Sequence, residues 1–361
     1  MKYNLILNPG STSTKIAVYD GTTPILNETI RHSAETIRLA GTKPLEQKKF
    51  RLQELERVLK SHEIAPEQLT GVIAIGGLIR PCKAGVYAIN EEMVSDLAQN
   101  RYHFHASNVG ALIAYDLAQK LHIGAYIADA NNTDEMQLKA MLSGMPELTR
   151  HMVAHTLNER GTAYLEARKM GKTYENCNFV IVHMGGGITI TAHRKGRMID
   201  GNAPRGEGPF CMDRTGGLNA YEVAQLCYSG KYSKEEMLRK ITGAGGVTAY
   251  LNTTDFREVE TRAKNGDKLA AEVFAALAYQ IAKEIGAMSV ALEGKVDAIL
   301  LTGGLAYSEA FTAEITRQVS FLGRIAVYPG EVELETLAAY LDEIQRGARI
   351  AMVYQAEGEE K

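Results

Sequence analysis

One local pattern occurs twice in this chain, and the repeat limits the possible folds more than any other feature. An apolar run over residues 3–8 leads into a turn rich in glycine and hydroxyl side chains at 8–15, and further extended segments follow. The same succession follows the apolar run 179–182, with Gly185-Gly186-Gly187 as its turn. The two copies begin about half a chain length apart, and this duplication predicts two domains of similar topology.

A second echo extends the repeat. Residues 71–75 form an apolar run that ends in Gly76-Gly77, and residues 298–302 form one that ends in Gly303-Gly304. Continuous apolar strands are typical of sheets that helices cover on both faces. We therefore expect an α/β protein made of two related domains with a cleft between them.

The expected domains are not continuous in the chain. Residues 1–152 and 335–361 should form the first domain and residues 153–334 the second, so that the last helix crosses back. Ser107-Asn108 precedes a segment with helical apolar spacing and is expected to cap that helix. A longer apolar stripe predicts a helix in the core or at a subunit interface. Its members are Leu269, Val273, Leu277, Ile281, Ile285, Met288 and Leu292.

Charge and cysteine content narrow the cellular setting. A formal net charge of −3 over 361 residues gives no overall attraction to nucleic acid or to an anionic membrane. No uncharged apolar stretch reaches the roughly 18 residues of a membrane span. The cysteines form no C-x-x-C pair, and scattered thiols are typical of a reducing cytosol. We therefore expect a cytoplasmic protein with neither a nucleic acid nor a membrane as partner.

The two glycine turns are candidate phosphate sites. Backbone N–H groups that converge in a turn form a nest for anions, and the turn from Asn8 to Lys15 adds hydroxyl donors and a cation. Gly185-Gly186-Gly187 allows the close backbone approach that a di- or triphosphate requires. Either turn alone could be an ordinary polar hairpin. Two turns at equivalent places, with Gly303-Gly304 as a third, favour phosphate binding, although no G-x-x-x-x-G-K-[ST] motif is present.

Several further side chains suit an anionic substrate. Arg214 lies in a glycine-rich loop, and its guanidinium offers a planar donor fork to phosphoryl oxygens. His105 stands at a predicted helix N-terminus, and Asp129 ends an apolar segment from which it can reach a cleft. For His155, in a predicted helix, a structural role is the simpler interpretation of the residue alone. A metal pair of His103 and His105 is not favoured, because no third histidine or cysteine stands nearby.

Long segments in a fixed order connect these residues. They are NPGSTSTK (8–15), GGLIRP (76–81), HASNVGA (105–111), HTLN (155–158), HMGGG (183–187), GEGPFCMDRTG (206–216), GAGGVTAYLNTTD (243–255) and LTGGLA (301–306). The series resembles the butyrate kinases, and more distantly the acetate kinases, of the actin-like phosphotransferase superfamily. This resemblance implies two duplicated actin-like (ribonuclease H-like) domains with a nucleotide cleft. It also implies reversible, direct in-line phosphoryl transfer from ATP to a short-chain fatty acid, giving ADP and an acyl phosphate, with Mg²⁺ and a homodimer or higher homo-oligomer.

The resemblance also assigns roles residue by residue. The implied nucleotide-binding positions are Asn8, Ser11, Ser13, Lys15, His183, Gly185, Gly186, Gly187, Gly303, Gly304 and Leu305. Asp129 matches the catalytic aspartate of these kinases, and His155 and Arg214 match residues that stabilise the phosphoryl group during transfer. The implied contacts to the acid are His105, Asn108 and Arg80. Glu333, together with Asp129, matches the implied metal-binding positions.

The sequence departs from the family pattern at three places. Ile75 stands where these kinases carry an arginine before the glycine pair, and Arg80 is a candidate replacement if its loop turns inward. The segment Ala130 to Thr133 is polar where the family has proline and valines. Val332-Glu333-Leu334 stands in place of Asn-Glu-Glu. Two of these departures fall on the expected acyl side of the cleft.

The implied reaction needs no general base, since a carboxylic acid with a pKa of about 4.3 is already ionised at neutral pH. Its difficulty is the approach of two anions, which charge neutralisation and in-line alignment overcome. Acetate, propionate or a branched acid are alternative acceptors, because one methylene changes binding by only about 0.8 kcal/mol. A nucleotide-binding regulator with weak catalysis is an alternative of another class, supported by Ile75 and the polar segment 130–133.

Overall fold

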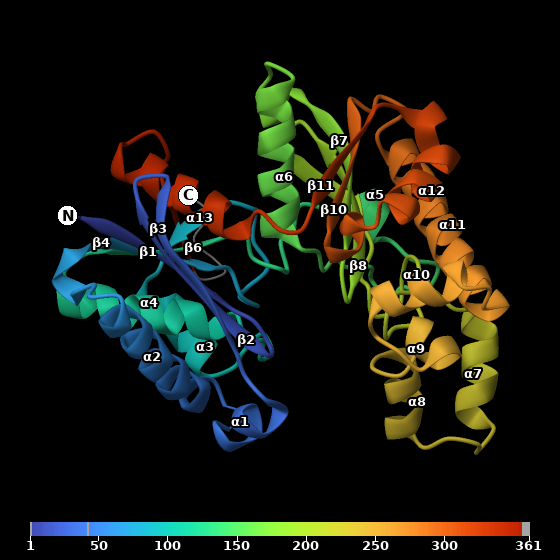
Figure 1. The fold of residues 1–361 in the computed structure, drawn as a ribbon, viewed down its shortest axis with the longest axis horizontal. Coiled ribbons are helices and arrows are strands. Elements are labelled where there is room, and N and C mark those ends of the chain that lie inside the picture. Colours follow the sequence, from blue (N-terminus) through green and yellow to red (C-terminus); the bar gives the residue numbers. More distant parts are fainter. Residues whose placement is uncertain (1, 42, 356–361) are drawn as a thin grey trace. The chain divides into compact units, whose positions relative to one another are not determined.

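The computed structural model describes residues 2–41 and 43–355. The chain forms two compact units: unit 1 comprises Met1–Asp134 and Val332–Lys361, and unit 2 comprises Glu135–Glu331. The end of the expected first domain, 356–361, lies outside the described residues. Each unit is built from one sheet and its covering helices, which confirms the predicted α/β class (Figure 1).

Unit 1 contains, within the described residues, a seven-stranded sheet in the order β12-β5-β6-β4-β1-β2-β3. Its strands are β1 (Tyr3–Pro9), β2 (Ser13–Asp20), β3 (Thr23–Arg31), β4 (Leu69–Ile75), β5 (Val86–Ala88), β6 (Gly124–Ala128) and β12 (Met352–Val353). The first three form an antiparallel meander, whereas β4 pairs in parallel with β1 and with β6. Every residue of β1 is buried, as its continuous apolar sequence predicts.

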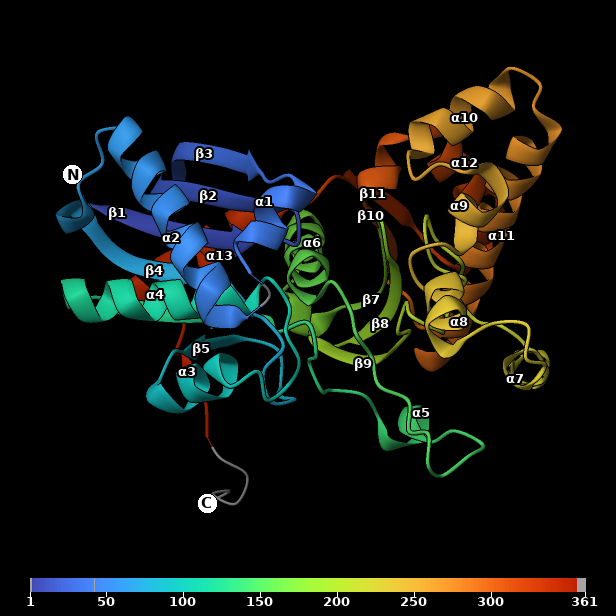
Figure 2. The ribbon, with the colours of Figure 1, turned by 90° about the horizontal axis from the view of Figure 1, so that it is seen from below.

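Helices cover both faces of this sheet. They are α1 (Ala34–Leu39), α2 (Pro44–Ser61), α3 (Glu91–Ala98), α4 (Asn108–Leu121), α13 (Glu333–Gln345) and the short η1 (Pro66–Gln68). α4 packs near Ala74 on one face of β4, and α13 packs near Gly71 on the other, because positions an odd number apart point to opposite faces. α2 runs beside α4 on the outer side, as Figure 2 shows. The last helix of the chain, α13, also packs against its first strand, β1.

Unit 2 contains, among its described residues, a five-stranded sheet in the order β11-β10-β7-β8-β9. Its strands are β7 (Asn178–Met184), β8 (Ile188–Arg194), β9 (Arg197–Gly201), β10 (Ala298–Gly303) and β11 (Ile325–Pro329). One face carries α6 (Thr156–Lys169), where Phe179 and Ile181 pack with Ala163. The other carries α11 (Lys268–Ala291), where Val180 and Leu277 share the larger core.

The remaining elements of unit 2 are short. They are α5 (Leu138–Met141), α7 (Ala220–Tyr228), α8 (Lys234–Ile241), α9 (Gly246–Leu251), α10 (Phe256–Lys264), α12 (Glu309–Val319), η2 (Tyr174–Asn176), η3 (Gly304–Tyr307) and η4 (Ser320–Leu322). α10 and α12 pack on α11. Along the stripe predicted for this long helix, Val273 to Met288 are core residues, whereas Leu269 is 44% exposed.

The predicted duplication is present in the strand order. In unit 1, β1, β2 and β3 form a meander with β4 parallel to β1; in unit 2, β7, β8 and β9 form a meander with β10 parallel to β7. The glycine turns at 8–15 and 185–187 therefore join equivalent strands. The glycine pairs 76–77 and 303–304 follow equivalent strands as well.

Residues 135–152 belong to unit 2, whereas the expected first domain extended to residue 152. The backbone of Met198 donates to Glu135, and Gln137 donates to the carbonyl of Ile199. Arg150 contacts the carboxylates of Asp200 and Glu207 at 3.4 and 3.0 Å. These contacts are long-range in sequence, and the composition of the segment gives no sign of them.

Candidate active site

The glycine turn of unit 1 joins β1 to β2. Asn8 and Lys15 pair across this hairpin, and the Gly10 N–H donates to the Ser13 carbonyl at 2.9 Å. Ser11 is exposed at the tip and Ser13 is partly exposed. The side chains predicted to bind phosphate therefore lie on one tight turn at the end of buried strands.

A buried arginine supports this turn from beneath. Arg51 of α2 is 1% exposed, and its guanidinium donates to the carbonyls of Gly10 and Ser13, both at 2.7 Å, and to Thr14 Oγ1 at 2.6 Å. Burial lowers the pKa of Arg51 to about 10, so it stays charged at neutral pH. Arg51 hydrogen-bonds the carbonyl oxygens of Gly10 and Ser13. These oxygens therefore point to the guanidinium and do not repel an anion bound on the other side of the turn.

Glu333 reaches the same turn from the start of α13. Asn8 Nδ2 donates to Glu333 Oε2, and Lys15 Nζ lies 3.8 Å from that oxygen. Glu333 is only 9% exposed. The structure thus brings together three predicted site residues that come from opposite ends of the chain.

Asp129 follows β6 and is 1% exposed. Its Oδ2 accepts a hydrogen bond from Tyr340 Oη at 3.1 Å. Its backbone has φ +50°, a conformation that costs free energy for any residue but glycine and is frequent at functional sites. Tyr340 and Glu333 are about two turns apart on α13 and so lie on one face of it. Asp129 is therefore held against the helix that carries Glu333.

The glycine pair 76–77 is a place of close backbone approach. A Cβ atom at Gly76 would lie 2.7 Å from the carbonyl oxygen of Ala128, and one at Gly77 would lie 2.3 Å from Asn108 Oδ1. Asn108 Oδ1 accepts from the Leu78 N–H at 2.7 Å. Asn108 thus fixes the loop that follows the pair.

The predicted N-cap position of α4 at Ser107 is confirmed, but the predicted capping hydrogen bond is not formed. Ser107 occupies the N-cap position but makes no side-chain hydrogen bond to the helix. Its Oγ lies 2.7 Å from His105 Nδ1, which also accepts from the Ser107 N–H at 3.3 Å. The side chains of Ser107 and Asn108 therefore bind the loops at His105 and Leu78, and not the first turn of α4.

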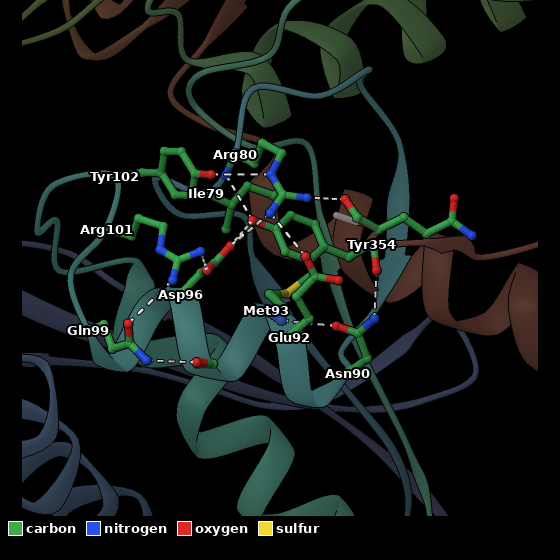
Figure 3. A network of polar contacts seen from close by, with 12 residues as sticks. Ile79, Arg80, Asn90, Glu92, Met93, Asp96, Gln99, Arg101, Tyr102 and Tyr354 are labelled. Atoms are coloured by element: carbon green, nitrogen blue, oxygen red, sulfur yellow. Dashed lines mark hydrogen bonds and ion pairs between the residues drawn. The ribbon is translucent and has the colours of Figure 1, made fainter. Parts of the chain in front are cut away.

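Arg80 lies inside a polar network of unit 1, which Figure 3 shows from close by. Its Nη2 is 3.0 Å from Glu92 Oε1 and 3.5 Å from Asp96 Oδ2. Its backbone N–H donates to Tyr354 Oη at 3.0 Å, and its guanidinium lies 5.1 Å from the centre of the Tyr354 ring. Two carboxylates neutralise the guanidinium, an arrangement that does not favour Arg80 as the replacement for the arginine expected at position 75.

Two stacked histidines lie in unit 2, close to its glycine turn. His155 is the N-cap residue of α6 and His183 lies near the end of β7, with ring centres 3.7 Å apart and planes 8° from parallel. Asn158 Nδ2 lies 2.9 Å from His183 Nδ1, and His155 Nδ1 lies 3.0 Å from Thr189 Oγ1. Burial, reinforced by His183, lowers the pKa of His155 to about 3, so this imidazole is neutral at pH 7.

The second glycine turn lies against both His183 and Arg214. The Gly185 N–H donates to the Gly187 carbonyl at 3.0 Å, and Gly186 is exposed. A Cβ atom at Gly187 would lie 2.7 Å from Arg214 Nη1, and one at Gly185 would lie 3.1 Å from His183 Nε2. Glycine is therefore needed at 187 for the guanidinium to lie on the turn.

The third glycine motif lies next to this turn. β10 pairs with β7 so that Thr302 is opposite His183, and a Cβ atom at Gly303 would lie 2.5 Å from the Met184 carbonyl. Gly303 has φ +90° and exchanges two backbone hydrogen bonds with Gly330. Gly304 is exposed, and Leu305 is 8% exposed. The second and third motifs thus end neighbouring strands.

Carboxylates are the available metal ligands. The described part of the chain contains no group of three or more His, Cys, Asp or Glu side chains that could hold a metal ion. Mg²⁺ is usually bound by one or two carboxylates together with substrate phosphates and water. Asp129 and Glu333, both buried oxygen donors of unit 1, fit this mode of binding.

The model of the acetokinase family matches residues 148–331. A protein of Listeria monocytogenes serovar 1/2a named probable butyrate kinase is 44% identical over 344 residues, which cover 95% of this chain and 97% of the relative. The chain belongs to the acetokinase family.

Solved structures agree with this assignment at the level of the fold. The acetate kinase of Porphyromonas gingivalis superposes with a TM-score of 0.74 at 17% identity, covering 96% of this chain and 99% of that chain. A propionate kinase from Francisella tularensis gives a TM-score of 0.71 at 17% identity, with 94% and 99% covered. These likenesses confirm the predicted fold class.

Three residues around these motifs escaped prediction: Arg51, Tyr340 and Glu159, whose carboxylate accepts hydrogen bonds from Thr189 and Thr191. Each is a polar residue whose partners come from another element, and nothing in the local pattern identifies it. Arg51 and Tyr340 lie on helices among apolar positions, where a buried position could have been inferred from spacing alone. Their partners could not be inferred.

No described helix of the protein is both long and apolar enough to cross a membrane.

Proposed function

We propose that this protein is a butyrate kinase, which transfers the γ-phosphoryl group of ATP to butyrate and forms butyryl phosphate and ADP. The observation that carries the proposal is the 44% identity, over 95% of the chain, to a relative named probable butyrate kinase. The geometry of both glycine turns supports it, because each turn has an exposed tip and a cationic side chain, Lys15 at the end of the first and Arg214 against Gly187 of the second.

Charge neutralisation is the main task of such a site. ATP and a carboxylate repel each other, and fixed donors must offset that repulsion as the two approach. In unit 2, Arg214 and the exposed backbone at Gly186 serve the phosphoryl oxygens. In unit 1, Lys15 and the hydroxyls of Ser11 and Ser13 serve phosphate oxygens, while Asn8 is held by Glu333.

The acceptor attacks with a carboxylate oxygen, and no side chain needs to remove a proton from it. His105 and Asn108, at the N-terminal end of α4, are the candidate contacts of the acid. Asn108 already fixes the loop after Gly77, so its effect on the acid passes through that loop.

Asp129 and Glu333 would hold Mg²⁺ with the nucleotide phosphates. When bound, the ion would neutralise phosphate charge and orient the transferred group. The contacts of these two carboxylates to Tyr340 and Asn8 fix their orientation without it.

Butyrate is the preferred acid in this proposal, with acetate, propionate and branched acids as poorer substrates. The direct test traps the acyl phosphate as its hydroxamate, with ATP, Mg²⁺ and straight acids of two to six carbons. We expect the highest kcat/KM at four carbons. A maximum at two or three carbons would make the protein an acetate or propionate kinase, and hydroxamate from none of the acids would favour a nucleotide-binding regulator.

The setting proposed for this enzyme is the cytoplasm, and its state a homo-oligomer. All four cysteines, which lie within the described residues, are free thiols, as a reducing compartment allows.

The exposed surface of α7 is the candidate contact between copies of the chain. α7 has no buried residue, and its Tyr221 and Tyr228 are 69% and 92% exposed. Exposed aromatic side chains on one helix suit contact with a second copy. Light scattering after gel filtration should give at least twice the mass of the chain, and less for the Tyr221→Glu, Tyr228→Glu variant.

A further inference from the structure

A buried carboxylate lies behind His155 in unit 2. Glu159 is on α6, one turn after His155, and is 0% exposed. Thr189 Oγ1 donates to its Oε1 at 2.5 Å, and Thr191 Oγ1 donates to its Oε2 at 2.8 Å. Both threonines face the same side of β8, since they are two positions apart. A buried carboxylate is costly without such donors, so each of its oxygens is satisfied by one hydroxyl.

The threonine hydroxyls fix the direction of the next hydrogen bond. A hydroxyl has one proton, and Thr189 gives its proton to Glu159. Its oxygen must therefore accept from His155 Nδ1, 3.0 Å away. In the neutral imidazole this leaves Nε2 without a proton and directed to whatever binds on the other side of the ring.

The second arm of the carboxylate leads away from His155. Thr191 likewise gives its proton to Glu159, so it accepts from His193 Nε2 at 2.8 Å. His193 Nδ1 then accepts from Tyr174 Oη at 2.6 Å. The protons of both arms point towards Glu159, which gives the network one consistent pattern.

His183 has the opposite tautomer. Asn158 Nδ2 can only donate, so His183 Nδ1 accepts and the proton of the neutral ring lies on Nε2. The two stacked rings therefore differ: Nε2 of His183 is a donor, and Nε2 of His155 is an acceptor. The difference follows from Thr189 and Asn158, which contact the two Nδ1 atoms.

We propose that Glu159 is a positioning residue for phosphoryl transfer, which acts through Thr189 to hold His155 in the Nδ1–H tautomer with Nε2 facing the phosphoryl group. The inference rests on the proposed function for the identity of the ligand. Glu159 itself touches neither substrate, and its effect passes through the ring of His155.

The tautomer decides how His155 can help an anion. Burial, His183 and Arg214 lower the pKa of His155 in the empty protein, while Glu159 and Glu331 raise it. A phosphoryl group at Nε2 adds negative charge beside the ring and favours uptake of a proton from solvent at that nitrogen. His155 then donates to the phosphoryl oxygen, and Glu159 stabilises the imidazolium through Thr189.

The test compares two variants of one residue. Thr189→Val keeps the shape of the side chain and removes the hydroxyl, whereas Thr189→Ser keeps the hydroxyl. Nitrogen-15 spectra of the imidazoles should show a protonated Nδ1 for His155 in the wild type and in Thr189→Ser. In Thr189→Val this preference should be lost, and kcat should fall about 10- to 100-fold with little change in the KM for ATP.

Thr191→Val is the matched control, since it makes the same change on the same strand beside the same carboxylate. We expect it to leave the tautomer of His155 unchanged and to lower kcat less than Thr189→Val does. An unchanged tautomer or a wild-type kcat in Thr189→Val would overturn the proposal, as would equal effects of the two valine variants. The spectra need no turnover, so a wild type that forms no acyl phosphate would contradict the proposed function and not the tautomer assignment.

Discussion

Each glycine turn lies against one arginine, but the two arginines have different surroundings. Arg51 is 1% exposed and its guanidinium binds three oxygens of the first turn. The Arg214 side chain is 28% exposed and lies on Gly187, beside the acidic side chain of Asp213 at 3.5 Å. Arg51 therefore maintains the shape of a turn, whereas Arg214 can meet a ligand.

Replacing Arg214 should affect turnover more than folding. We expect Arg214→Ala to lower kcat by about 10²- to 10³-fold, the usual loss of one donor that stabilises the transition state. Arg317→Ala is the control, because Arg317 is 70% exposed on α12 and pairs with Glu314 within its own helix. It should retain wild-type kcat. Near-normal turnover of Arg214→Ala in steady-state assays would remove Arg214 from the mechanism.

His155 should make the stability of the protein depend on pH. Burial and His183 lower its pKa to about 3 in the folded protein, whereas in the unfolded chain it is about 6.5. Below pH 6.5 the unfolded state binds a proton that the folded state does not. The unfolding free energy should therefore decrease as the pH is lowered, by up to about 1.4 kcal/mol per pH unit from this group. Urea unfolding at pH 7.5, 6.5 and 5.5 measures the slope. His155→Asn should flatten it; an identical slope would contradict the assignment.

Single residues were predictable where a motif fixes the backbone and not where a partner comes from afar. Asn8 and Lys15 belong to one turn, and their pairing follows from the hairpin. Arg51 binds that turn from another element, and Glu159 meets its threonines on a strand 30 positions later. Their burial depends on packing, which local sequence does not specify.

Among the elements, α2 has a structural task beyond covering the sheet. Arg51→Met should remove the donors to Gly10, Ser13 and Thr14, cost about 3 kcal/mol of unfolding free energy and raise the KM for ATP. Arg57→Met on the same helix is the control, because Arg57 is 57% exposed and pairs with Glu54. It should stay within about 0.5 kcal/mol of the wild type. Equal midpoints of urea unfolding for both variants would show that Arg51 does not hold the turn.

A buried side chain just after the C-terminal strand β12 likewise holds a loop of unit 1 by hydrogen bonds. Tyr354, 3% exposed, follows this strand, and its Oη donates to Asp96 at 2.8 Å while accepting from the Arg80 N–H. Tyr354→Phe should therefore lower the unfolding free energy by about 1–2 kcal/mol. Tyr228→Phe, at a side chain 92% exposed, should leave it unchanged. Calorimetry measures the stability of both variants. Equal stabilities would show that Tyr354 does not hold the loop at Arg80.

Element types followed from the sequence more readily than element ends did. The apolar runs 3–8 and 179–182 became buried strands, because their continuous burial needs no knowledge of the partner. The capping hydrogen bond expected for α4 is missing because Ser107 and Asn108 have alternative partners in His105 and Leu78. Local hydrogen-bond competition of this kind is decided by the tertiary structure.

For the whole molecule, the duplication was the most reliable signal, since one repeat reports on two sheets at once. The chain nevertheless divides at residue 135, before the apolar pattern of the second copy begins. Segment 135–152 joins unit 2 through Glu135, Gln137 and Arg150, none of which belongs to the repeat. A repeat defines the units, while the linking segments are placed by individual contacts.

The reaction proposed for this protein is the transfer of a phosphoryl group from ATP to a carboxylate. Phosphorus-31 spectra recorded during incubation with ATP, Mg²⁺ and butyrate follow this transfer on both reactants and products. We predict that the γ-phosphate signal of ATP declines while ADP and butyryl phosphate grow in equal amounts, only when butyrate is present. Release of inorganic phosphate without any acyl phosphate, or unchanged spectra although ATP binds, would show that the protein does not phosphorylate butyrate.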